Sequence, residues 1–316
     1  MRIGLAGESR TIYAQLAPWG RSRLQEIGAR RGFDPHGWRD LIGLGVLHGS
    51  CDGVGCEQIV AGLMATSIGG LPGPVLEAEL AVASGSREAA DRLRSGALVT
   101  SVAPGPGGRT VVAGGAVAEL VVSQTDGRVL ARGRLPPAPT TVELDNGFLD
   151  RVARDEADTA RGRRWLMASA IVAGLCRGAL ERTARHARDR EQFGRPLASF
   201  QAVQFKLAEC AHLVESLDLM ALDAARRADA ADGKSEVAAA LAWRWAHRVS
   251  RTVERHAHQV HGALGFSREL GLVELTWPMY WLRTSVGLAD THSLVLERRR
   301  RAGEAPASTV LGGFAA

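Results

Sequence analysis

The sequence predicts a mainly α-helical protein with a small β domain in the middle of the chain. Apolar residues recur every three or four positions in residues 1–96 and again from residue 158 onward, which is the spacing of amphipathic helices. Between these regions, short β-branched runs are separated by glycine and proline, as is typical of strands and turns. We therefore expect a shortened N-terminal helical domain at 1–96, a β domain at 97–150 and a C-terminal four-helix bundle at 151–316.

The overall composition is that of an ordinary globular protein, with 46% hydrophobic and 23% charged residues. Much of the net charge of +5 lies in arginine runs at predicted helix ends, 161–164 and 298–301. Anionic small molecules such as nucleotides and coenzyme A fit this distribution as well as nucleic acid does, so nucleic-acid binding is a weak interpretation. No apolar run approaches the ~20 residues of a membrane span, and no signal-peptide core is present. A cytoplasmic enzyme or enzyme subunit is the default expectation.

The four cysteines do not indicate a metal site. Cys51 and Cys56 are too far apart for a Cys-x-x-Cys pair, and no second pair follows them. Cys176 and Cys210 fall inside helical patterns, where cysteine usually behaves as a small buried apolar residue. We expect no metal ligands.

The N-terminal domain is expected to consist of short helices. Ile12, Leu16, Trp19 and Leu24 recur at roughly helical spacing. A later pattern at residues 75–94 is rich in alanine and glutamate, and it predicts one helix that ends before the Ser-Gly pair at 95–96.

The β domain is expected to be small and dependent on its neighbours. The runs at 98–100, 110–112 and 120–122 predict strands, and Asp126-Gly127 predicts a hairpin turn after the third run. About fifty residues lie near the lower limit for an independent core.

The C-terminal half predicts four long helices. Apolar stripes run from Trp165 to Ala179, from Val203 to Ala221 and from Val237 to Val253, with a break at 230–234 between the second and third helices. A fourth helix is expected over 274–300, interrupted by its proline at 278.

The turn between the first two helices of this predicted bundle contains a candidate binding motif. Residues 190–196 read Arg-Glu-Gln-Phe-Gly-Arg-Pro, where one helix must end and the next begin. Gly194 permits the left-handed backbone that ends a helix, and Pro196 suits the start of the next. An arginine, an amide and an aromatic ring at such a corner can bind the diphosphate and ring edge of a nucleotide. The alternative is a simple interhelical turn with a solvated arginine.

The domain order, together with Arg190-x-Gln192-Phe193-Gly194 and the later Gln259-Val260-His261-Gly262-x-x-Gly265, resembles the flavin-dependent acyl-CoA dehydrogenase family. The resemblance is good over roughly 166–266 and weaker over 38–123. It implies a tetramer in which FAD lies between the β domain and the bundle, with its diphosphate and adenine reaching across a subunit interface.

The resemblance also implies roles for the residues of the first motif. Arg190 would contact the FAD diphosphate. Gln192 and Phe193 would flank the adenosine half, and Leu197 and Phe200 would line the pocket.

The second motif would come from the neighbouring subunit and close over the same diphosphate through Gln259, Val260, Gly262 and Ala263. Small residues after a helix end allow close backbone approach, and backbone N–H groups can face an anion. Without the resemblance, Gln259 and His261 are equally interpreted as residues that form hydrogen bonds between helices.

The proton acceptor of the family is missing. In the family reaction, a glutamate removes a proton α to the thioester while the flavin accepts hydride from the β carbon. The two positions at which family members carry this glutamate hold Arg164 and Val286 here, and neither side chain can accept a proton. The acids nearest in sequence, Glu269, Glu274 and Asp290, are expected to be surface charges.

Two further departures concern the flavin and substrate regions. The β-domain loop that would contact the isoalloxazine is poorly matched by residues 100–105, where Thr100 and Ser101 are the nearest candidates. The segment 275–281 is aromatic where the family has arginine and acids, and we expect it to pack in the core rather than reshape a pocket.

Three functions remain open from the sequence. The chain resembles the base-less subunit of a heteromeric α2β2 acyl-CoA dehydrogenase, as found in bacterial steroid side-chain catabolism, whose partner subunit supplies the glutamate. It could instead be a homo-oligomeric relative that acts on an acyl thioester in biosynthesis with another acid or by non-redox chemistry, or a binding or scaffold protein without FAD. A redox-active enzyme would use FAD, an acyl-CoA substrate and an electron-transfer flavoprotein.

Overall fold

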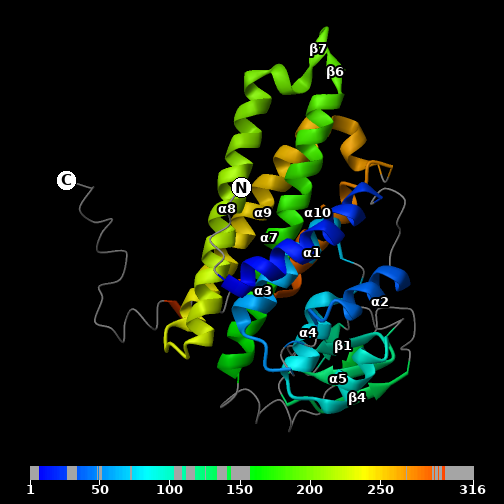
Figure 1. Cartoon of the computed structure of the whole chain (residues 1–316), viewed down its shortest axis with the longest axis vertical. Helices are drawn as coiled ribbons and strands as arrows, with labels where there is room; N and C mark the ends of the chain where they lie inside the picture. Colours follow the sequence, from blue (N-terminus) through cyan, green and yellow to red (C-terminus); the bar gives the residue numbers. More distant parts are fainter. Residues whose placement is uncertain are drawn as a thin grey trace, which may run out of the picture.

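The computed structural model consists of a long helical bundle with a small sheet beside one end (Figure 1). It describes residues 7–26, 34–47, 49, 52–71, 73–102, 109–111, 118–124, 126–133, 141–143, 157–267, 269–286, 288, 291 and 294–295. Cys51, Asp290, most of the loop after Val102 and the arginine run at 298–301 lie outside the described residues.

The N-terminal part is helical, as predicted. Its elements are α1 (Gly7–Gln25), α2 (Pro35–Gly43), α3 (Cys56–Thr66), the 3-10 helix η3 (Ser67–Gly69), α4 (Val75–Ala83) and α5 (Arg87–Arg94). The prediction of one helix over 75–94 is wrong, because the chain turns at Gly85, whose φ is +83°. Ser86 then caps α5 by accepting a hydrogen bond from the Ala89 N–H at 3.3 Å.

The sheet is formed by three strands, in the order β1 (Val99–Val102), β3 (Leu120–Ser123) and β4 (Val129–Arg132). β1 and β3 are parallel, whereas β3 and β4 form an antiparallel hairpin. The predicted turn at Asp126-Gly127 is confirmed, with φ +68° at Gly127 and its N–H donated to the Ser123 carbonyl at 3.1 Å. A separate antiparallel pair joins β2 (Arg109–Val111) to β5 (Thr141–Glu143).

Four helices form the bundle: α7 (Ala157–Asp189), α8 (Gln201–Asp229), α9 (Ser235–His261) and α10 (Val273–Val286). The break between α8 and α9 falls where it was predicted, with Ala231 in a left-handed conformation. The predicted interruption at Pro278 is wrong, because α10 continues through it. Leu275, Met279 and Leu282 are buried against the bundle, and this packing outweighs the hydrogen bond that proline cannot donate.

A single large hydrophobic cluster joins the three parts of the described chain. On the sheet, Val99, Leu120 and Val122 belong to this cluster, together with Leu76 of α4 and Trp165 of α7. The sheet therefore shares its core with the helices, and the domain limits at 96/97 and 150/151 stay a prediction. No helix in the described ranges combines the length and apolar character that crossing a bilayer requires.

Arg177 of α7 and Asp218 of α8 form an ion pair whose side chains are only 7% and 1% exposed. We expect Arg177→Met to lower the free energy of unfolding by about 3–5 kcal/mol, since it leaves a buried charge without its partner. The double variant Arg177→Met/Asp218→Leu should lose clearly less. Urea unfolding measures both. Arg21→Ala, which breaks a solvent-exposed pair with Glu181, is the control and should cost less than about 1 kcal/mol.

Candidate functional site

The motif at 190–196 forms a tight hairpin at one end of the bundle (Figure 1). α7 ends at Asp189, and the short strands β6 (Glu191–Gln192) and β7 (Arg195–Pro196) pair antiparallel before the 3-10 helix η5 (Leu197–Ser199) leads into α8. Phe193 and Gly194 occupy the turn with φ of +55° and +77°, so the left-handed conformation predicted for Gly194 is confirmed.

The hairpin gathers the side chains of the first motif. Phe193 is 91% exposed and meets Phe200 edge-to-face, with ring centroids 6.1 Å apart. The Arg195 guanidinium lies over the Phe200 ring at 4.1 Å, while the Leu197 N–H donates to the Arg190 carbonyl at 2.8 Å.

The polar groups of this motif face solvent. Arg190 is exposed, and no carboxylate in the described part of the chain pairs with it. Gln192 is also exposed, and its amide donates to the carbonyl of Glu191 at 2.8 Å. An exposed arginine without a carboxylate partner among the described residues, on a hairpin that also carries two aromatic rings, is suited to an anionic nucleotide.

The second motif lies where α9 ends and the 3-10 helix η6 (Gly262–Phe266) begins. Gln259, Gly262 and Ala263 are exposed, whereas the Val260 side chain is only 8% exposed and points into the core. The expectation that backbone N–H groups face an anion here does not hold for Gly262, because its N–H donates to the His258 carbonyl at the helix end.

One chain brings the two motifs together. His186, four residues before Arg190, stacks on His261 with ring centroids 4.3 Å apart. The Nδ1 atom of His261 lies 2.8 Å from the Ala257 carbonyl, which orients the ring. Both motifs therefore belong to the same end of one bundle, and each need not come from a different subunit.

The two positions at which the resemblance places the missing base also meet, far from this end. Arg164 donates to the carbonyl of Ser285, the residue before Val286, at 3.1 Å, and to the Gln124 side chain at 3.2 Å. Burial lowers the pKa of Arg164, although Glu77 opposes the shift. Along α7, the distance from Arg164 to Asp189 is about 38 Å at the ordinary helical rise.

Glu77 is a carboxylate near this position that the sequence analysis missed. It lies in the first turn of α4, where its backbone carbonyl accepts a hydrogen bond from the Ser101 hydroxyl at 2.5 Å. Burial raises the pKa of Glu77, while its own N–H and the Arg164 guanidinium lower it. No local signal distinguishes Glu77 in the sequence, because the same short helix also carries Glu79.

The remaining candidates take different places. Thr100 and Ser101 are buried in β1, so neither side chain lines an open site in this chain. Glu269 is exposed and Glu274 partly so, as expected of surface acids. The aromatic segment of α10 is only partly core, because Trp277 is 64% and Tyr280 48% exposed.

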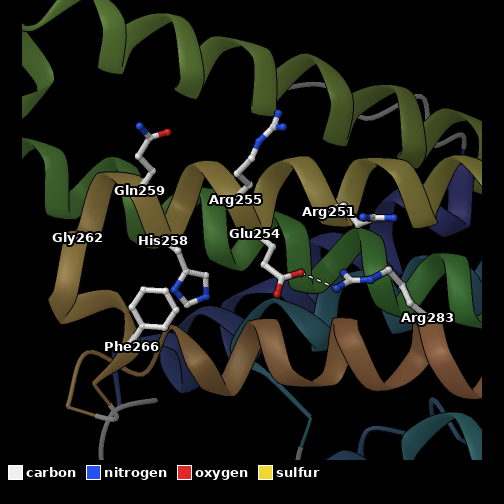
Figure 2. A pocket seen from close by; sticks show the side chains of 8 residues that line it. All are labelled: Arg251, Glu254, Arg255, His258, Gln259, Gly262, Phe266 and Arg283. Atoms are coloured by element: carbon white, nitrogen blue, oxygen red, sulfur yellow. Dashed lines mark hydrogen bonds and ion pairs between the residues drawn. The ribbon is translucent and has the colours of Figure 1, made fainter.

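A groove of about 680 Å³ opens between α9 and α10 beside the second motif (Figure 2). It is lined by Arg251, Glu254, Arg255, His258, Gln259, Gly262, Phe266 and Arg283. The described residues of its lining include three arginines and one acid, so this part of the groove favours anions.

Comparison with known proteins finds relatives of this chain among the acyl-CoA dehydrogenases. The family model "Acyl-CoA dehydrogenase, C-terminal domain" matches residues 158–286. Acyl-CoA dehydrogenase FadE34 of Mycobacterium tuberculosis is 30% identical over 312 residues, covering 83% of this chain and 42% of FadE34. The chain thus spans less than half the length of this relative, and 34% of the probable acyl-CoA dehydrogenase YngJ of Bacillus subtilis.

Solved structures share the fold across nearly the whole chain. One is the ChsE4–ChsE5 complex from Mycobacterium tuberculosis, with a TM-score of 0.69 and 22% identity over 97% of this chain and all of that one. Another is PigA with FAD and proline, with a TM-score of 0.71 and 16% identity over 96% of this chain and 99% of that one. The chain has the acyl-CoA dehydrogenase fold, and residues 158–286 form a C-terminal domain of that family. Both findings confirm the resemblance.

The His186–His261 stack predicts that the free energy of unfolding decreases at acidic pH. Burial lowers the pKa of His261 to about 4 against the opposing hydrogen bond with the Ala257 carbonyl, and the nearby His186, Arg182 and His258 lower this pKa further. The pKa of His261 is therefore lower in the folded protein than its ordinary value of 6.5 in the unfolded chain. The neutral ring contributes fully to the stability of the fold above pH 6.5, and this contribution is lost as the pH falls toward 4, because the unfolded chain then binds the proton more readily. We expect about 2 kcal/mol of this contribution to be lost between pH 7 and pH 5.

Urea unfolding at several pH values measures this loss. His261→Phe, which keeps a ring against His186 but cannot be protonated, should flatten the pH dependence over this range. An equally steep pH dependence in that variant would assign the effect to other groups.

Proposed function

We propose that this chain is a flavin-binding subunit of a heteromeric acyl-CoA dehydrogenase, in which it holds the diphosphate end of FAD and contributes no proton acceptor. The observation that carries the proposal is the position of its two candidate regions. The flavin motifs lie at one end of α7, and the positions of the missing base lie about 38 Å away along the same helix.

A single flavin molecule cannot contact both regions of one chain over that distance. A flavin whose diphosphate is held at the Arg190 hairpin must therefore place its reactive ring on another subunit. This arrangement also accounts for Arg164 and Val286, because a subunit that supplies only the diphosphate site needs no carboxylate of its own.

The residues at the hairpin fit FAD. Arg190, which pairs with no carboxylate among the described residues, presents a guanidinium that can bind two phosphate oxygens, and the exposed Phe193 ring offers an apolar face to the ribose of the adenosine half. The Gln259 amide, exposed at the end of α9, can donate to the same diphosphate. When bound, FAD supplies the hydride acceptor for α,β-desaturation of an acyl-CoA thioester.

The proposed partner is a second acyl-CoA dehydrogenase subunit that carries the glutamate. The ChsE4–ChsE5 complex, which shares this fold, is a precedent for assembly from two different chains. The electrons would leave through an electron-transfer flavoprotein, if the assembled enzyme is redox-active as proposed.

Arg190→Ala tests the flavin site. We expect the affinity for FAD to fall by tenfold or more, because the diphosphate loses a bidentate charged donor worth about 1.5–3 kcal/mol. Flavin absorbance after gel filtration, of the chain alone and of the chain coexpressed with catalytic acyl-CoA dehydrogenase subunits of the same genome, measures the retained FAD. Arg188→Ala removes an exposed arginine from the last turn of α7 and is the matched control.

Two results would count against the proposal. Equal flavin content in the Arg190 and Arg188 variants would refute the motif assignment. A colourless protein both alone and with its coexpressed partners would leave a binding or scaffold role instead.

A second candidate function rests on Glu77. Its raised pKa and its position beside Arg164 would suit a general base in a homo-oligomeric enzyme that acts on an acyl thioester. The buried hydroxyls of Thr100 and Ser101 argue against an open flavin-ring site there.

Glu77→Gln separates the two functions. Under the subunit proposal, we expect acyl-CoA oxidation by the assembled complex to stay within about twofold of the unmodified protein, because the partner supplies the base. A loss of a hundredfold or more, the usual contribution of a general base, would establish Glu77 as that base and overturn the proposal. Dye reduction by a series of acyl-CoA substrates measures the rate, with Glu269→Gln as a surface control.

A further inference from the structure

The groove between α9 and α10 contains positive charge that no carboxylate of the described residues neutralises fully. Glu254, the acid among the described residues that line it, pairs with Arg283 at 2.6 Å (Figure 2). Arg283 also donates to the Ser250 hydroxyl at 3.2 Å. Neither Arg251 nor Arg255 forms an ion pair with any carboxylate among the described residues. Two cations in one groove therefore remain available to a ligand.

These two arginines extend from the second flavin motif along α9. Arg255 precedes Gln259 by one helical turn, about 6 Å at the ordinary rise, and both side chains project from the same side of the helix (Figure 2). Arg251 follows one turn further from the motif. Their spacing provides a row of donors that leads away from the proposed diphosphate site.

The end of α9 requires such cations if it binds an anion. The C-terminal end of a helix carries a negative partial charge, which repels phosphate. The Gly262 N–H does not offset this charge, because it donates to the His258 carbonyl at the helix end. Positive side chains must therefore supply the attraction.

An aromatic ring lies at the end of the same groove. Phe266 is 72% exposed and stacks by one face on His258, with ring centroids 4.6 Å apart. Its other face is accessible to a flat heterocycle. Arginines and an exposed aromatic ring in one groove match a phosphorylated nucleotide better than they match a simple inorganic anion.

We propose that Arg255 and Arg251 bind phosphate oxygens of the adenine nucleotide half of the cofactor, and that Phe266 stacks on its base. This inference rests on the proposed flavin site and assigns it residues outside both sequence motifs. All of these residues belong to one chain, so the groove binds the nucleotide without a second subunit.

Isothermal titration of the full chain with ADP, inorganic pyrophosphate and adenosine tests the groove. We expect Arg255→Ala to weaken ADP and pyrophosphate by about tenfold or more, because a charged hydrogen-bonding pair is lost. Arg251→Ala should have a smaller effect of the same kind. Phe266→Ala should weaken ADP and adenosine but leave pyrophosphate unchanged.

Arg248→Ala is the matched control, since Arg248 is exposed on the same helix but lies outside the groove. Arg255→Lys should recover part of the affinity by restoring the charge without the fork. Melting temperatures within experimental error of the unmodified chain would show that these surface changes leave the fold intact.

Equal ADP affinity in the Arg255 and Arg248 variants would overturn the inference, as would an unmodified chain that does not bind ADP. The flavin site is judged separately by Arg190→Ala. Loss of FAD in that variant with normal ADP binding in Arg255→Ala would refute the groove alone. Weaker ADP binding in Arg255→Ala, with flavin content unaffected by Arg190→Ala, would support the groove and refute the hairpin assignment.

Discussion

Arg164 and the Arg190 hairpin stand at opposite ends of α7, and the length of that helix constrains every role this chain can have in flavin chemistry. The helix has 33 residues and packs against the bundle helices and the N-terminal helices along most of its length. Bending it to bring the two ends together would disrupt the shared core. The separation is therefore a fixed property of the fold. Under the proposed function, a flavin held at one end completes its site on another subunit.

Arg164 also has a structural role at the position where the resemblance places a carboxylate in some family members. An arginine cannot be deprotonated in a protein, and burial of its charge requires hydrogen-bonding partners. The Gln124 side chain and the Ser285 carbonyl provide them, which ties the end of β3 to the end of α10. At the position where the resemblance places the catalytic glutamate, this chain has an arginine whose hydrogen bonds connect the sheet to the bundle.

Local signals predicted much of the fold and part of the site. Gly194 and the Asp126-Gly127 pair specified their turns, because left-handed backbone is strongly selective for such residues. The helix interruption predicted at Pro278 does not occur, because tertiary packing of α10 outweighs one lost hydrogen bond. Glu77 and the groove arginines could not be found from the sequence, since their significance depends on helices that meet only in three dimensions. The proximity of the two motifs within one chain could not be predicted for the same reason, since it depends on how α7 and α9 pack.

Two acids of α4, separated by one residue, show how the surroundings decide the protonation of a carboxylate. Glu79 is fully buried and pairs with Arg163 at 2.6 Å, which compensates its charge. Two residues earlier, Glu77 faces Arg164, whose hydrogen bonds go to Gln124 and Ser285 instead. Burial then dominates and raises the pKa of Glu77. The hydrogen bonds by which Arg164 connects the sheet to the bundle therefore leave the charge of Glu77 only partly neutralised. The structural role of Arg164 and the candidate role of Glu77 as a base thus depend on the same guanidinium.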